Sequence, residues 1–143
     1  MKILREMVRS TTMGIDAIDH VLPYAEDENL VRLMNEQKQS MKDMLCEAKK
    51  GLTRDEIEEA EGSKFAKTML KASSSFSAMM NSDTSHLARM LIEGYETGIV
   101  SMQKCLNEMR KAHEEAPLCA KDLMLCGLPV IQWRYKRAAF ASS

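Results

Sequence analysis

Asp83, His86 and Glu93 are the residues of this chain whose types and spacing best suit a metal site. His86 follows Asp83 by three positions and Glu93 follows His86 by seven, so a helix would place all three side chains on one face. Carboxylate and imidazole ligands together suit iron, manganese or zinc. In the alternative interpretation Asp83 caps a helix, while His86 and Glu93 lie on a polar seam or in solvent. The spacing therefore predicts either a single-ion site or an ordinary polar face.

Sulfur offers a second chemistry, because the chain contains four cysteines and 13 methionines. Cys119 and Cys126 are seven residues apart on one predicted helix face. Facing a third cysteine, Cys105 or Cys46, they would suit Cu(I), which prefers thiolate and thioether ligands. The alternative is that cysteine and methionine only fill a core. We expect all four thiols to be buried in helices and the protein to lie in a reducing compartment, the cytoplasm.

The residues from 82 to 109 form the longest amphipathic pattern and hold all three candidate metal ligands. Apolar or small residues recur there at steps of three and four, as on one buried face of a helix: Leu87, Leu91, Gly94, Gly98, Met102, Cys105 and Met109. Each glycine inside a helix costs about 1 kcal/mol relative to alanine. We therefore expect another backbone to pack closely against Gly94 and Gly98.

Two earlier stretches also have helical periodicity. The first runs from about 3 to 22 and should end at Pro23. The second runs from about 26 to 50, with acidic residues at its start and Gly51 after its end. Its apolar stripe contains Leu30, Leu33, Met34, Gln37, Met41, Met44, Leu45 and Ala48. These stretches predict two long helices joined by a short connection.

The other segments are shorter or less regular. Thr53 and Glu56 have capping-box spacing, which predicts a short acidic helix ending at Gly62 and Ser63. A pattern from 65 to 80 is helical and either continues into the 82–109 stretch or breaks before it, so the residues from 63 to 113 form one helix or two. Pro117 should open a further helix. Residues 127–143 form an atypical basic tail.

Length and composition limit the class of protein. A chain of 143 residues favours one domain, which we assign to residues 1–126. The net charge of −1 provides no general attraction for nucleic acid, and no apolar run is long enough to span a membrane. Few glycines and prolines indicate an all-α fold. We therefore expect neither nucleic acid nor membrane as a partner.

An internal similarity relates the first helix to the 82–109 stretch. With an offset of 84 residues, Gly14 aligns with Gly98 and Leu22 with Leu106. The stretches TTMGIDAIDHVLP and TSHLARMLIEGYETGIVSMQKCLN resemble the ferritin-like superfamily, and are most similar to small bacterial ferritin-like proteins of unknown function. The resemblance implies an antiparallel four-helix bundle, here with an extra short helix between its two hairpins.

The resemblance also implies what a metal centre would need. Members that bind two metal ions use inward-facing glutamates and Glu-x-x-His pairs. This chain has no Glu-x-x-His, and its nearest equivalent is the Asp-x-x-His formed by Asp83 and His86. The sequence therefore predicts a non-enzymatic structural, interaction or stress-related protein that self-associates, without a catalytic residue or an organic cofactor. The alternatives are a protein that binds iron, manganese or zinc through an incomplete ligand set, and a Cu(I)-handling bundle.

Overall fold

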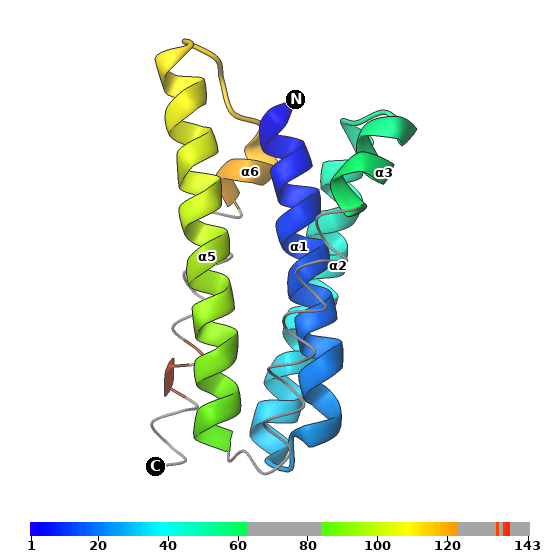
Figure 1. Cartoon of the computed structure of the whole chain (residues 1–143), viewed down its shortest axis with the longest axis vertical. Coiled ribbons are helices and arrows are strands. Elements are labelled where there is room, and N and C mark those ends of the chain that lie inside the picture. Colours follow the sequence, from blue (N-terminus) through cyan, green and yellow to red (C-terminus); the bar gives the residue numbers. More distant parts are fainter. Residues whose placement is uncertain (63–83, 123–133, 135, 138–143) are drawn as a thin grey trace.

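The computed structural model describes residues 1–62, 84–122, 134, 136 and 137, with the backbone alone at residues 84–86 and 122. Every element in these ranges is a helix, so the predicted all-α class is confirmed. No helix in the described ranges is long and apolar enough to cross a bilayer. Figure 1 shows the long helices α1, α2 and α5 lying side by side, with the short helices α3 and α6 near one end.

Helices α1 and α2 form an antiparallel hairpin. Helix α1 spans Lys2–Val21, and a short 3-10 turn, η1, follows at Leu22–Tyr24 around Pro23. Helix α2 spans Glu28–Lys50 and begins at Asp27, whose side chain accepts a hydrogen bond of 2.8 Å from the backbone N–H of Leu30. The two predicted helices are therefore confirmed, with bounds that differ by one or two residues.

The short helix α3, Arg54–Glu61, follows from its local sequence. The Thr53 hydroxyl accepts from the backbone N–H of Glu56, and the Glu56 carboxylate accepts from the backbone N–H of Thr53, which confirms the predicted capping box. Gly62 ends the helix, as expected. Helix α3 packs on α1, where the chain's terminal amine lies 3.7 Å from the Glu56 carboxylate.

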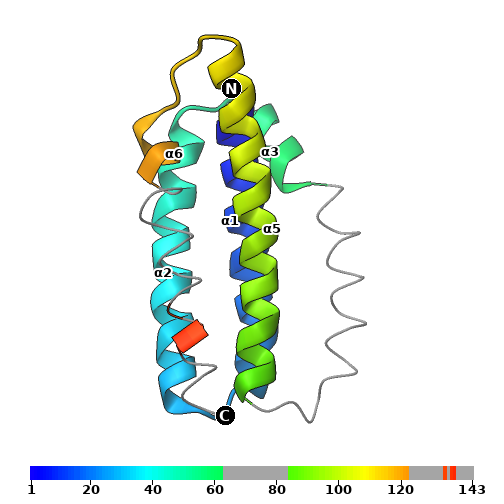
Figure 2. The same cartoon turned by 90° about the vertical axis from the view of Figure 1, so that its left-hand side faces the viewer.

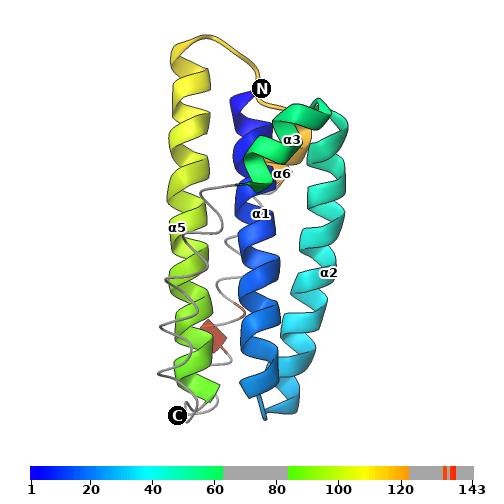
Figure 3. The same ribbon diagram turned by 45° about the vertical axis from the view of Figure 1, so that its right-hand side comes forward.

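Helix α5 spans Thr84–Lys111 and runs antiparallel to α1 along its whole length (Figures 1 and 3). It ends in a Schellman motif. The backbone N–H of Glu114 donates to the carbonyl of Met109 at 2.9 Å, and His113 takes the left-handed conformation with φ 55°. The predicted connection from 113 to 116 is confirmed. Helix α6, Leu118–Asp122, then begins one residue later than we expected, after Pro117.

The core lies along the inner faces of the three long helices. On α2 the buried set is Leu30, Leu33, Met34, Gln37, Met41 and Ala48, all of them members of the predicted stripe. Helix α1 is buried on several sides, because α2, α3, α5 and α6 all contact it. Figure 2 shows α6 beside the end of α2. Gln37 is 4% exposed, and its amide oxygen has no hydrogen-bond partner within the described part of the chain.

Three predictions concern residues that lie partly or wholly outside the described ranges. The helical pattern from 65 to 80, and the choice between one helix and two from 63 to 113, lie outside the described residues. Of the tail from 127 to 143, only residues 134, 136 and 137 are described, and all three are helical. Arg134 pairs with Glu36 of α2 at 2.6 Å, so this part of the basic tail contacts α2.

Candidate functional site

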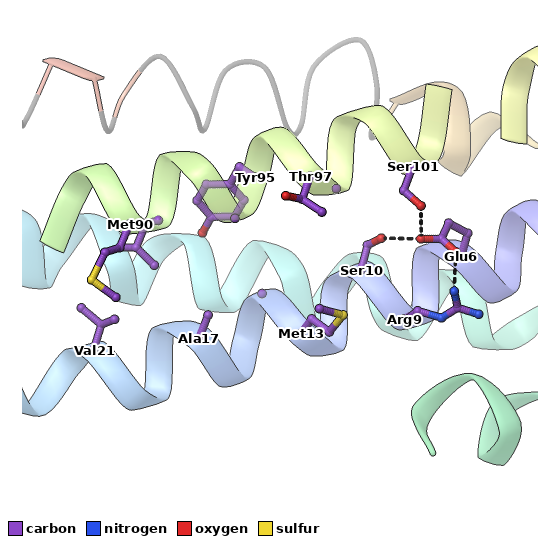
Figure 4. Close-up of a pocket in the computed structure, with 14 residues that line it drawn as sticks. Glu6, Arg9, Ser10, Met13, Ala17, Val21, Met90, Tyr95, Thr97 and Ser101 are labelled. Atoms are coloured by element: carbon purple, nitrogen blue, oxygen red, sulfur yellow. Dashed lines mark hydrogen bonds and ion pairs between the residues drawn. The ribbon is translucent and has the colours of Figure 1, made fainter. Parts of the chain in front are cut away.

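A cleft lies between α1 and α5. Its volume is about 430 Å³, within the range of roughly 300–1,000 Å³ that is usual for small-molecule sites. Figure 4 shows the residues that line it, all of them drawn from these two helices. The cleft runs lengthwise between the two antiparallel helices, along their axes.

Most of the cleft is apolar. Helix α1 contributes Met13, Ala17 and Val21, which are spaced by four residues and so follow one face of the helix. Helix α5 contributes Met90 and Leu91 at the end of the cleft where Val21 lies. The side chain of Tyr95, 5% exposed, lies in the middle of the cleft (Figure 4). An apolar guest would therefore find apolar contacts along most of the cleft.

Two glycines show how the space arises. A Cβ built on Gly94 would meet no described atom within 4 Å, so this glycine faces open space. The prediction that another backbone packs closely there was wrong for Gly94. A Cβ on Gly14 would instead lie 2.7 Å from Sδ of Met41 and 3.9 Å from the Tyr95 ring. The missing side chain at Gly14 therefore lets Met41 of α2 pack against α1, whereas the missing side chain at Gly94 leaves space in the cleft.

The other end of the cleft is polar and is organised by Glu6. One carboxylate oxygen, Oε1, accepts from Oγ of Ser101 at 2.6 Å and from Oγ of Ser10 at 3.2 Å. The other oxygen, Oε2, pairs with Nη1 of Arg9 at 3.1 Å. The Glu6 side chain is 11% exposed and that of Arg9 is 39% exposed. The network compensates the burial of the Glu6 charge and leaves Arg9 at the rim.

The predicted metal ligands are not brought together in the described part of the structure. Asp83 and the side chain of His86 lie outside the described residues. Glu93 is exposed on α5 and does not line the cleft. Among described residues no three of the side chains of His, Cys, Asp and Glu are grouped as a metal site would require. The metal centre at Asp83, His86 and Glu93 stays a prediction, tested by metal content after loading with Fe(II), Mn(II) or Zn(II) in wild type and His86→Ala.

The cysteines differ from the prediction in one respect. Cys105 is buried, but Cys46 is exposed, so the expectation that all four thiols are buried was wrong. Cys119 donates to Sδ of Met7 at 4.0 Å. Burial and the nearby Glu6 charge raise the pKa of Cys105, so its thiol stays protonated and is a poor nucleophile near neutral pH. Cys126 lies outside the described residues, and the Cu(I) hypothesis stays a prediction.

The sequence interpretation did not identify the polar end of the cleft. Glu6 was available as a signal, because it is the one acidic residue in the apolar stretch from 3 to 8. A carboxylate there must find donors if α1 is covered on several sides. Which residues supply them depends on how α5 is placed, and the sequence did not specify that placement.

A scan against protein-family models, a search of curated proteins and a search of solved structures gave no match to this chain. The function must therefore be argued from the cleft and its chemistry.

Proposed function

We propose that this protein acts by binding, without catalysing a reaction, and that the cleft between α1 and α5 receives an apolar guest. The observation that supports this most is the cleft of about 430 Å³ with a mostly apolar lining. Atoms that line an empty space lose dispersion contacts, and a guest of matching shape restores them. Burial of apolar surface contributes roughly 25 cal/mol of favourable free energy per Å² removed from water.

We also propose a ferritin-like bundle as the finer description of the fold. The described helices support this proposal, because α1 lies antiparallel to both α2 and α5 (Figure 1), as neighbouring helices do in such bundles. The sequences of α1 and α5 also align with an offset of 84 residues, as equivalent members of two helical hairpins would.

A neutral apolar dye, Nile red, tests the binding function. We expect wild-type protein to bind it at one site, with increased fluorescence. Gly94→Leu should abolish that binding, because its side chain would extend into the cleft from a position where a Cβ meets no described atom. Leucine is also the better helix former, by about 0.8 kcal/mol, so the variant should unfold at no lower temperature than wild type.

Val100→Leu provides the matched control, since Val100 is 55% exposed on α5 and is not part of the cleft. This variant should bind the dye as wild type does. If wild type binds no dye, or if Gly94→Leu binds it unchanged, the proposed function is refuted. The first result would mean that the chain itself fills the cleft in solution.

A further inference from the structure

We propose that the guest is a single-chain alkyl carboxylate, with its chain along α1 and α5 and its carboxylate at Arg9. This inference rests on the proposed binding function and specifies the ligand of the same cleft. Three properties of the cleft lead to it: its length, its apolar wall and the charge at one end.

The length fits one alkyl chain. From Arg9 to Val21 the cleft follows twelve residue steps of α1, about 18 Å at roughly 1.5 Å per residue. A bilayer has a hydrocarbon core of roughly 30 Å, so one lipid chain occupies about 15 Å. The cleft from Arg9 to Val21 therefore accommodates one such chain lengthwise, with its carboxylate at the Arg9 end. A compact aromatic ligand would leave part of the wall uncovered.

The charge at the polar end favours an anionic head. An arginine has five N–H donors, and within the described structure the partner of Arg9 is Glu6, which binds Nη1. The edge formed by Nε and Nη2 remains for a carboxylate, which arginine binds through two parallel hydrogen bonds. The incoming head would therefore form new bonds without breaking those of Glu6.

A cationic head fits less well. Its natural partner would be Glu6, but that carboxylate already accepts from Ser10, Ser101 and Arg9 and is largely buried. A cation would have to displace Arg9 and leave the guanidinium without its partner. A neutral alcohol would gain the apolar contacts but not the paired bonds to Arg9. The carboxylate is the head group that uses the donors still available.

The head group is tested with dodecanoate, dodecanol and dodecylammonium, each below its aggregation concentration. Binding is measured directly by calorimetry and also by displacement of Nile red. We expect dodecanoate to bind at least tenfold more tightly than either of the other two. Decanoate, shorter by two methylenes, should bind about fifteenfold more weakly than dodecanoate, because each buried methylene changes affinity about fourfold.

Arg9→Gln should remove the preference for the carboxylate and leave the affinity for dodecanol unchanged. Lys104→Gln removes one positive charge from an exposed position of α5 outside the cleft, and should keep the preference. If Arg9→Gln unfolds, Arg9→Lys retains the charge without the two parallel bonds and should reduce the preference in part. Thermal unfolding is recorded for every variant.

The outcomes separate this inference from the function on which it rests. Equal affinity for all three head groups, or a preference that survives in both Arg9 variants, overturns the carboxylate assignment while dye binding still supports a binding cleft. Dodecanoate affinity that is insensitive to Gly94→Leu places the ligand elsewhere and also overturns it. Failure of both dye and dodecanoate to bind refutes the inference and the proposed function together. Sedimentation with and without dodecanoate tests whether a second copy of the chain occupies the cleft. If dodecanoate dissociates a dimer, the second copy is the occupant, and that result also overturns the inference.

Discussion

The same glycine-to-alanine change should have opposite effects at Gly94 and Gly14. Both glycines lie inside long helices, where alanine is favoured by about 0.8–1.0 kcal/mol. At Gly94 the added methyl group meets no described atom within 4 Å. Gly94→Ala should therefore raise the free energy of unfolding by about 1 kcal/mol.

At Gly14 the added methyl group would lie 2.7 Å from Sδ and 2.9 Å from Cε of Met41. These atoms are the flexible end of a side chain that is only 2% exposed, so they must shift within a buried region. Overpacking of this kind costs about 1–3 kcal/mol. After the gain in helix propensity is subtracted, Gly14→Ala should be between neutral and about 2 kcal/mol less stable than wild type.

Urea unfolding at 25 °C, followed by circular dichroism, measures both variants against wild type. We expect the free energies of unfolding of the two variants to differ by about 1–3 kcal/mol with similar m-values. In thermal unfolding, Gly94→Ala should shift the midpoint upward by about 4 °C. If Gly94→Ala is destabilised as much as Gly14→Ala, a neighbour packs against Gly94 in solution. The cleft, and the reasoning built on it, would then be wrong.

Three further variants test local features by the same unfolding assay. Thr53→Ala removes the hydroxyl that accepts from Glu56 and should lower stability by about 1 kcal/mol, whereas Thr53→Ser should not. His113→Gly should raise stability by up to about 1 kcal/mol, because glycine adopts the left-handed φ of 55° without strain; a loss would contradict the Schellman assignment. Burial raises the pKa of Asp16 above its ordinary value of 3.8, so the ionised group disfavours the folded state at neutral pH. This penalty is lost as the pH falls through the raised pKa, so Asp16→Asn should be more stable than wild type at pH 7, with a difference that closes below about pH 4. A difference of the same size at both pH values would refute that assignment.

The helices could be predicted because their information is local. The apolar stripe of α2, including Gln37, is set by spacing along one helix, and every buried residue of α2 belongs to it. The capping box at Thr53 needs only residues that are three apart. Helix ends shifted by one or two residues, because Asp27 and Pro117 each lie just before a helix instead of inside it.

The cleft could not be predicted because it depends on where α5 lies relative to α1. Gly14 and Gly94 have the same side chain and similar helical surroundings in the sequence. In the structure Met41 of α2 occupies the space beside Gly14, whereas Gly94 faces open space. Periodicity indicates that one face of a helix carries apolar or small residues, but it does not show whether another helix packs against that face. Close packing was therefore the wrong expectation for Gly94.

The polar end of the cleft follows from the central position of α1. A helix that contacts α2, α3, α5 and α6 has little free surface, so a charged residue on it is buried unless it reaches an edge. Glu6 lies where α5 passes, and Ser101 reaches it from that helix at 2.6 Å. Arg9, one turn further along α1, is near enough to pair with Glu6 yet extends to the rim. Burial of one carboxylate in this way leaves an arginine with unused donors beside an apolar cleft, the combination that an alkyl carboxylate requires.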